Sequence, residues 1–292
     1  MSTPRARLDE GLRLQKSGRF DEALACYREV EASGDASLLS ESLRRRAAIH
    51  HTRSEWDEAL ETARRAAAIA REAGLVDQLA GALNAEAAVF LAVGRYDEAE
   101  SLLSRVLDTT SDRRSRGVAF QNLGFIAASQ SDFPTAKQHF MEAHRCYASA
   151  GLVWEEAYVL HNFGAAALEH ASPRVAASLL EDAVGAAQRA EDLDLLALAR
   201  TSLAEALTAL GQQDEAERLA REAAEHFTRT GNRWRLIQSQ QALATIALAR
   251  GQRDEAVRLL RHALATAKEI GVSQEEGPIV KRLSELGESV EG

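Results

Sequence analysis

Histidine pairs are the first candidates for chemistry in this chain, because imidazole is a common metal ligand. His50 and His51 are adjacent, and His139 and His144 are separated by five positions. On a helix, adjacent side chains point about 100° apart, and neighbours on one face are three or four positions apart. Neither pair has the spacing to hold one ion, so we predict surface or groove histidines and no metal site.

Adjacent carboxylates are the second candidates, because enzymes use acidic residues for acid and base catalysis. Asp57-Glu58 is one such pair, but the same pair recurs in every well-matched repeat, as a catalytic dyad would not. The chain also has no nucleotide-binding glycine loop, no HExxH or CxxC motif and no Gly-x-Ser-x-Gly elbow. We therefore predict a protein that is not an enzyme and has no catalytic residues, metal or cofactor.

The carboxylate pairs belong to a short phrase, typified by Gly94-Arg95-Tyr96-Asp97-Glu98-Ala99, that occurs seven times. Its final residue is an alanine at positions 23, 59, 99, 136, 176, 216 and 256. The intervals between successive alanines are therefore 36, 40, 37, 40, 40 and 40. A period of this size indicates a solenoid built from one repeated supersecondary unit.

Each phrase separates two stretches of helical periodicity. Gly94 is expected to end a first helix, and Asp97 and Glu98 to start a second one, where carboxylates suit the positive end of the helix dipole. In four repeats a glycine stands at the fifteenth position after the phrase alanine and should end the second helix: Gly74, Gly151, Gly231 and Gly271. Repeats one, three and five lack this glycine, so their connections are expected to differ.

Small residues also recur on the first helix, at the twelfth position before the phrase alanine. They are Gly11, Ala47, Ala87, Gly124, Gly164, Ala204 and Ala244. A small residue on each helix at a constant interval predicts a close helix–helix contact, where a larger side chain would not fit.

These features resemble the tetratricopeptide repeat, which repeat four matches best through Phe120, Leu123-Gly124, Phe133, Ala136 and Phe140. The period is nearer 40 than 34, as in kinesin light chains and the effector domains of some bacterial activators. The resemblance implies an all-α fold: a right-handed α–α superhelix with seven helix–turn–helix repeats and a C-terminal capping helix.

The repeat runs nearly from end to end, so we predict one solenoid domain over residues 1–292. The predicted repeats are about 4–34, 37–73, 76–110, 114–151, 153–191, 193–231 and 233–271, with the cap at 274–290. Each unit of a solenoid buries its apolar face on its neighbours, and a terminal cap keeps the open end in solution.

In tetratricopeptide-like solenoids the first helices line a concave groove that binds ligands. The predicted groove residues are Arg44, Asn84, Gln121, Asn122, Phe125, Tyr158, His161, Asn162, Thr201 and Gln241. Most are polar and neutral, and an amide can both donate to and accept from an extended peptide backbone. The alternative interpretation is that Asn122 and Asn162 merely tie neighbouring helices together.

Arg44, Arg45 and Arg46 form a local basic cluster with His50 and His51. Three successive residues cover almost all faces of a helix, so only Arg44 is expected to face the groove. A solvated surface explains such a run without any function. If the cluster is functional, it should meet an acidic segment of the partner.

Composition limits the partners. The net charge of −9 argues against direct binding to nucleic acid or to anionic membranes. The first residues lack the apolar stretch of a signal peptide, and no apolar run is long enough to span a bilayer. The two cysteines, Cys26 and Cys146, are too far apart in a solenoid to pair. We expect a soluble, cytoplasmic protein, and the excess of arginine over lysine suggests a bacterial one.

The favoured functional hypothesis is an adaptor or scaffold that binds a protein or peptide in its groove. The alternative is a ligand-sensing regulatory subunit that acts on a separate DNA-binding or catalytic chain. A homo-oligomeric scaffold, formed when copies dock on one another, is a third and weaker hypothesis.

Overall fold

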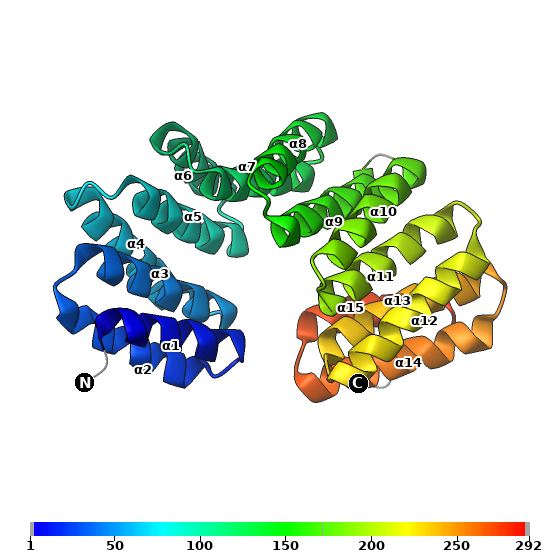
Figure 1. The fold of residues 1–292 in the computed structure, drawn as a ribbon. Helices are drawn as coiled ribbons and strands as arrows, with labels where there is room; N and C mark the ends of the chain where they lie inside the picture. Colours follow the sequence, from blue (N-terminus) through cyan, green and yellow to red (C-terminus); the bar gives the residue numbers. More distant parts are fainter. Residues whose placement is uncertain (1–2, 171, 290–292) are drawn as a thin grey trace. The chain divides into compact units, whose positions relative to one another are not determined.

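The structure is a computed structural model that describes residues 3–170 and 172–289 (Figure 1). Within these ranges the chain forms fifteen α-helices and one short 3-10 helix, η1 (Glu31–Ser33), and no strand. The α-helices are α1 (Pro4–Lys16), α2 (Phe20–Val30), α3 (Ala36–Thr52), α4 (Trp56–Glu72), α5 (Val76–Ala92), α6 (Tyr96–Thr109), α7 (Arg113–Ser129), α8 (Phe133–Ser149), α9 (Val153–His170), α10 (Pro173–Arg189), α11 (Leu193–Ala209), α12 (Gln213–Thr230), α13 (Arg233–Ala249), α14 (Arg253–Ile270) and α15 (Ser273–Glu285).

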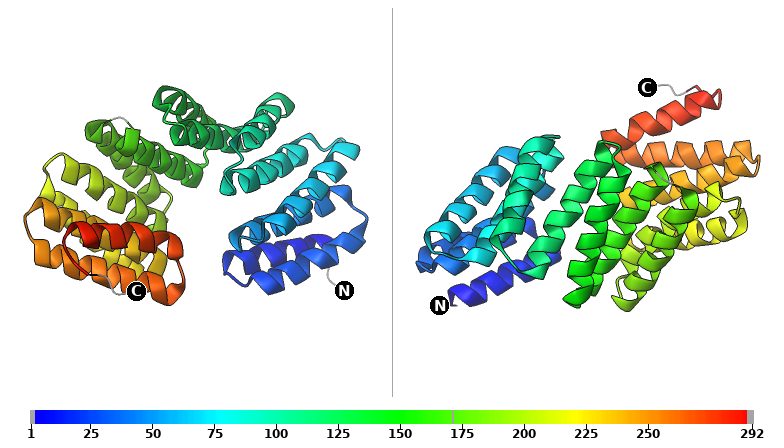
Figure 2. Two further views of the ribbon diagram at one scale, coloured as in Figure 1. Left: turned by 180° about the vertical axis from the view of Figure 1, so that it is seen from behind. Right: turned by 90° about the horizontal axis from the view of Figure 1, so that it is seen from above.

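Consecutive helices pack in pairs, from α1 with α2 to α13 with α14, and α15 packs on α14 (Figure 2). The predicted all-α helical repeat with a final capping helix is thereby confirmed. The chain divides into two compact units, Met1–Ala150, called here the N-unit, and Gly151–Gly292, the C-unit. That all the repeats form one continuous domain stays a prediction.

The turn inside each helix pair needs a left-handed residue. Gly94 adopts this conformation with φ 74°, as a glycine can without steric cost. Where the phrase begins with serine, Ser54 and Ser131 take the same conformation, with φ 59° and 61°. The left-handed turn therefore forms with or without a glycine at this position, although glycine adopts it at the lowest steric cost.

The connections between repeats differ less than expected. Repeat five lacks the second glycine, and Glu191 stands at that position and adopts the left-handed conformation, with φ 55°. Our expectation of a different connection there was wrong. Repeats one and three do differ. The helix α2 runs into η1, and α6 ends at an extended Thr110 (φ −126°, ψ 150°).

The Asp-Glu pairs lie in the first turn of the second helices and do not cap them. The helix α6, for example, begins at Tyr96, and its N-cap Arg95 makes no side-chain capping bond. Asp97 and Glu98 follow in the first turn. Their stabilising effect is therefore their charge beside the positive end of the helix dipole.

The recurring small residues mark the closest helix contacts. All seven phrase alanines are fully buried. A methyl group added at Gly124 would lie 2.9 Å from the Phe140 ring, and one added at Gly164 would lie 2.5 Å from Leu180 Cγ. The prediction of close packing at these positions is confirmed.

The apolar core is local to neighbouring repeats. In the N-unit one cluster joins α5, α6 and α7 through Leu83, Leu103 and Ile126. In the C-unit Ile279 and Leu283 of α15 are buried against α13 and α14, so this helix does cover the last repeat. Over residues 3–170 and 172–289, no helix is both long and apolar enough to cross a bilayer.

Candidate functional site

The first helices of the repeats contact one another in each unit. In the N-unit α1 contacts α3, α3 contacts α5 and α5 contacts α7, and in the C-unit α11 contacts both α9 and α13. Each unit therefore has a face made of first helices, on which the predicted groove residues stand. A hollow opens on this face in each unit.

The hollow of the N-unit, called here the N-unit pocket, has a volume of about 550 Å³. It includes two of the predicted groove residues, Arg44 and Asn84. Its lining comes from α3, α5 and α7 and consists of Glu41, Arg44, Arg45, Ala48, Asp77, Gln78, Gly81, Asn84, Ala85, Arg114, Ser115 and Val118.

Arginines dominate the electrostatics of the N-unit pocket. The Glu41 carboxylate lies 3.9 Å from the Arg44 guanidinium and 3.5 Å from that of Arg45. Burial, together with the like charges of Arg45 and Arg114, lowers the pKa of Arg44 to about 10. Our expectation that only Arg44 would face inward was wrong. Arg45 and Asn122 share one repeat position, the fourteenth before the phrase alanine, and in α3 that position also faces the pocket.

Asn84 has a structural role beneath this pocket. It is 7% exposed, and its Nδ2 donates to the carbonyl oxygen of Ser115 at 3.0 Å. The bond ties α5 to α7. For this residue, therefore, the structure favours the helix-tying role over direct contact with a partner.

The other predicted residues of the N-unit lie further along α7. Gln121 and Asn122 are half-buried and Phe125 is 50% exposed. None of the three belongs to the lining of the N-unit pocket. An exposed ring beside two amides suits an apolar side chain of a partner whose backbone the amides bind.

The hollow of the C-unit, called here the C-unit pocket, has a volume of about 270 Å³. It brings together three predicted residues, His161, Thr201 and Gln241. Its lining comes from α9, α11, α13 and α15 and consists of these three with Leu198, Ser202, Glu205, Arg235, Gln238 and Arg282.

The three predicted residues of the C-unit pocket bond to neighbouring helices. His161 Nε2 lies 3.1 Å from Ser202 Oγ, and Gln241 Nε2 donates to Glu275 at 3.0 Å. Thr201 is 4% exposed and bonds to Ser239 at 2.9 Å. Burial lowers the pKa of His161 to about 4, so this imidazole is neutral near pH 7.

Glu205 is the unusual acid of the C-unit pocket. Burial raises the pKa of its carboxyl to about 7, the charge of Glu169 adds to the rise, and Arg282 opposes it. Arg282 is itself bound, because it donates to Thr245 Oγ1 at 2.8 Å. The Glu205 carboxyl therefore changes charge near neutral pH.

Tyr158 and Asn162 stand beside this pocket and outside its lining. Tyr158 is half-buried and stacks on Trp154, with ring centroids 5.3 Å apart. Trp154 is 45% exposed and donates from Nε1 to Asp192 at 2.9 Å, across to the next repeat. Asn162 is half-buried, with its Oδ1 3.3 Å from Nδ1 of His161.

Three histidines of the two predicted pairs contact other side chains of the chain. His50 Nδ1 lies 2.5 Å from Glu55, and His51 packs edge-on against Trp56. His139 stacks on Phe120. In the part of the chain that the structure describes, no group of three or more His, Cys, Asp or Glu residues is placed to hold a metal ion.

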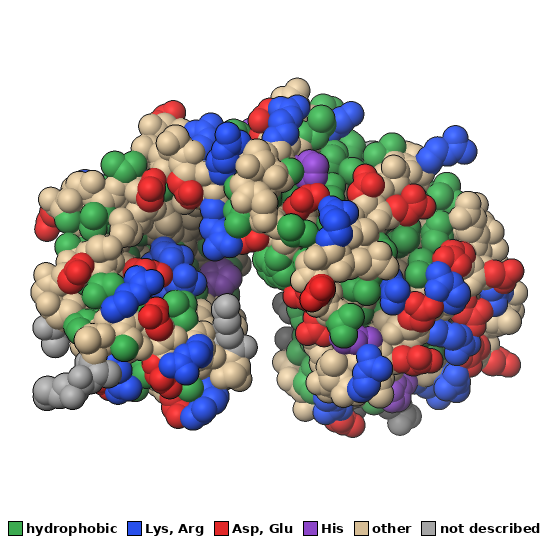
Figure 3. Space-filling model, viewed as in Figure 1, with side chains coloured by type: hydrophobic (Ala, Val, Ile, Leu, Met, Phe, Trp, Pro, Cys, Tyr) green, Lys and Arg blue, Asp and Glu red, His purple; other side chains and the backbone are tan. Residues whose placement is uncertain are grey.

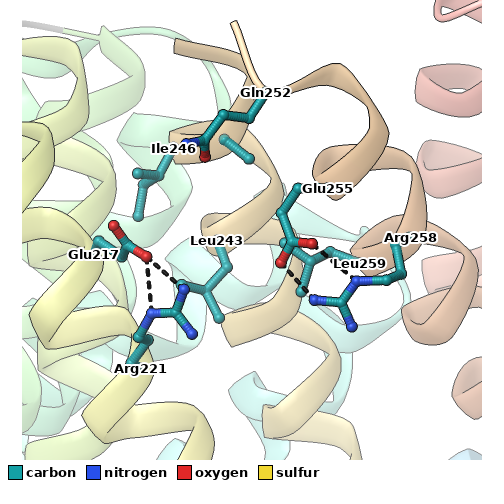
Figure 4. Close-up of a pocket in the computed structure, with 9 residues that line it drawn as sticks. Glu217, Arg221, Leu243, Ile246, Gln252, Glu255, Arg258 and Leu259 are labelled. Carbon is teal, nitrogen blue, oxygen red and sulfur yellow. Dashed lines mark hydrogen bonds and ion pairs between the residues drawn. The ribbon is translucent and has the colours of Figure 1, made fainter. Parts of the chain in front are cut away.

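A smaller hollow of about 70 Å³ lies between α12, α13 and α14 (Figure 4). Its charged side chains pair with each other, Arg221 with Glu217 and Arg258 with Glu255, at 2.5 Å. Arginine and carboxylate side chains are likewise mixed over the visible surface of these helices (Figure 3). The charges of this hollow therefore neutralise each other within it.

Two residues of the N-unit pocket that sequence reasoning missed share a repeat position with two tryptophans. Asp77, Arg114, Trp154 and Trp234 all stand at the twenty-second position before the phrase alanine of their repeat. Asp77 and Arg114 line the N-unit pocket, and Trp154 stands beside the C-unit pocket. This position, at the start of the first helix, is the signal that would have found them.

Helix pairs that recur along the chain and pack on their neighbours define the class of helical repeat proteins. Models of the tetratricopeptide repeat match residues 4–29, 82–117, 196–225 and 236–270. With the recurring phrase and the helix pairs, these matches show that the chain contains tetratricopeptide repeats in both units. No curated protein sequence matches it significantly.

Solved structures share the fold at low sequence identity. The apo form of RapI aligns with a TM-score of 0.69 at 14% identity, over 92% of this chain and 99% of that one. A Rap protein complexed with Competence and Sporulation Factor gives 0.63 at 14%, over 92% and 80%. The Rap conjugation gene regulator of the plasmid pLS20, in complex with the Phr* peptide, gives 0.65 at 14%, over 88% and 70%.

Proposed function

We propose that this chain is a non-catalytic adaptor that binds a protein or peptide segment along its first helices. The observation that carries the proposal is the position of both large pockets, which lie on first helices in each unit. The net charge of −9 disfavours nucleic acid and anionic membrane as direct partners. The predicted groove residues other than the buried Asn84, His161 and Thr201 would supply the contacts.

Proteins of the same fold support a peptide as the ligand. Two of the similar structures are Rap proteins, one complexed with Competence and Sporulation Factor and one with the Phr* peptide. Their identity with this chain is 14%, so they support the class of ligand and not its sequence.

Neutral amides would let the groove bind a peptide backbone with little demand on its sequence. Asn122 in the N-unit and Asn162 in the C-unit occupy the same repeat position. A backbone bonded by either amide would gain about 1 kcal/mol from that bond. Phe125 in the N-unit and Tyr158 in the C-unit would each add an apolar contact to a segment bound in their own unit.

Asn122→Ala and Asn162→Ala are each expected to weaken partner binding in their own unit about fivefold, because each removes one hydrogen bond of about 1 kcal/mol. The measurement is quantitative co-purification of the tagged chain from its native host, followed by a titration of the captured partner. Gln138→Ala with Gln188→Ala is the matched control, since these exposed glutamines stand on α8 and α10. Binding that survives the asparagine changes unaltered would remove the groove from the proposal.

The alternative function is a ligand-sensing regulatory subunit acting on a separate DNA-binding or catalytic chain. The N-unit pocket favours it specifically, because about 550 Å³ is the size of a small-molecule site. A thermal-shift screen with metabolites separates the two functions. A ligand that raises the melting temperature and alters partner binding would favour sensing.

Self-association is the remaining option for partners. Light scattering at several protein concentrations tests it directly. A monodisperse monomer would eliminate the homo-oligomeric scaffold and leave the adaptor as the working hypothesis.

A further inference from the structure

The C-unit pocket contains charged side chains of both signs that do not pair with one another. Glu205 stands on α11, Arg235 on α13 and Arg282 on α15. Arg235 donates to Gln238 at 2.9 Å, and Arg282 donates to the Thr245 hydroxyl at 2.8 Å. In the part of the chain that the structure describes, both guanidinium groups thus bond to neutral acceptors and neither pairs with a carboxylate. Each keeps donors for a bound anion.

The Glu205 carboxyl lacks a bonded partner. Burial and the charge of Glu169 raise its pKa to about 7, and the charge of Arg282 opposes the rise. No hydrogen bond to this carboxyl is made by the residues in the described ranges. A desolvated carboxylate without a donor is costly. A ligand that brings a cation to it would remove that cost.

The rest of the pocket is neutral and small. His161 is uncharged near pH 7, and the other lining side chains are hydroxyls and amides with one leucine, Leu198. The volume of about 270 Å³ lies just below the roughly 300–1,000 Å³ of pockets for drug-sized ligands. A ligand of fewer atoms would therefore fit, and it would meet a carboxylate on α11 and guanidinium groups on α13 and α15.

We infer that the C-unit pocket binds a small zwitterion of the amino-acid class, with its ammonium on Glu205 and its carboxylate on the guanidinium groups of Arg235 and Arg282. A free amino acid carries both charges on one carbon atom, so it pairs with both signs inside one small hollow. Charge-assisted bonds of this kind are strong in a partly desolvated site. The inference is independent of peptide binding, and it gives the alternative function, the sensing subunit, a class of ligand.

The pH dependence of binding follows from Glu205. The charged and titratable groups around it are Glu169 and His161 on α9, Arg235 on α13 and Arg282 on α15. The ligand ammonium pairs with the carboxylate form of Glu205, which becomes the main form as the pH rises through about 7. Binding should therefore tighten about tenfold from pH 6 to pH 8. A ligand held only as an anion by the arginines would instead bind more weakly as Glu205 ionises.

The test is a thermal-shift screen of the full-length chain with the standard amino acids, followed by calorimetric titration of the one that stabilises it most. The matching acid without the amino group is expected to bind about tenfold more weakly, as is the matching amide without the carboxylate. Glu205→Gln and Arg282→Gln should each weaken binding of the amino acid by a similar factor, because each removes one charged partner.

Glu225→Gln is the matched control, because Glu225 is exposed on α12 of the same unit. Circular dichroism on each variant establishes that it is folded. The inference is overturned if no amino acid stabilises the chain, if the acid without its amino group binds as well as its parent, or if both pocket variants bind normally. Partner binding by the asparagine variants is a separate measurement, so the proposed function and this inference can fail independently.

A second arm identifies the source of the zwitterion, since a short peptide carries the same two charged groups at its ends. The dipeptide and tripeptide of the selected amino acid are titrated beside the free amino acid. Weaker binding of both peptides is expected, because the pocket is small and the two charges stand further apart in a peptide. Equal or tighter binding of either peptide would overturn the free amino acid as the ligand.

Discussion

Gly164→Val is expected to lower the free energy of unfolding of the C-unit by about 3 kcal/mol, at the upper end of overpacking costs. Gly164 lies on α9 where α10 crosses it, and an added Cβ would lie 2.5 Å and 2.8 Å from two carbons of Leu180. Leu180 is fully buried, so it has no free space into which to move. The two helices must therefore separate or Leu180 must leave its rotamer.

Gly185→Ala is the matched control on α10. An added Cβ at Gly185 meets only the end of the Arg189 side chain, at 3.8 Å. Because alanine favours the helix over glycine, this change should raise stability by about 0.5–1 kcal/mol. Urea denaturation of both variants provides the measurement. Equal stability of the two would contradict the close-packing role of the recurring small residues.

Glu205→Gln is expected to stabilise the chain above pH 7 and to have little effect near pH 4. The ordinary pKa of this group is 4.5, and burial raises it to about 7 in the folded chain. Below pH 4.5 both states are protonated. Between pH 4.5 and 7 the folded state holds the proton more tightly, so the free energy of unfolding of the natural chain falls as pH rises.

Above pH 7 that loss is complete, and the neutral glutamine avoids it. The expected gain is about 2 kcal/mol at pH 8, allowing for relaxation around the charged group. Thermal unfolding from pH 4 to pH 8 provides the measurement, with Glu225→Gln, exposed on α12, as the control. A gain of the same size at every pH, or a gain in the control, would show that the Glu205 charge is not responsible.

Most of the fold could be predicted because the same sequence pattern occurs seven times. All seven copies of the phrase end in a buried alanine, and five of the second helices have an acidic first turn, so errors in one copy are corrected by the others. The prediction failed for the connection after repeat five, because it judged that turn by residue type alone. Ser54, Ser131 and Glu191 show that the turn takes its left-handed residue even without glycine.

The candidate sites were harder to predict because they depend on side chains from several repeats. Counting from the phrase alanine predicted Arg44, Asn84, His161, Thr201 and Gln241 as groove residues, and each of them lines one of the two pockets. It did not show that Asn84 and Thr201 are buried and bonded to other helices, since burial is decided by the neighbouring repeat.

The basic cluster shows a second limit of sequence reasoning. A single helix presents Arg44 and Arg45 in different directions, and on that ground only one of them was expected to face inward. The N-unit pocket extends over three helices, so it accepts both, together with Arg114 from a helix two repeats further on. Which side chains line a pocket of this kind is decided by the tertiary structure.

The central claim, binding along the first helices, is tested most directly by photo-crosslinking in the native host. A photoreactive phenylalanine is placed at Phe125 of α7 or at Met141 of α8, which are exposed apolar positions in the same unit (50% and 38%). We expect a discrete protein or peptide partner to crosslink at position 125 and not at position 141. Crosslinking at position 141 alone, or equally at both positions, would contradict the account.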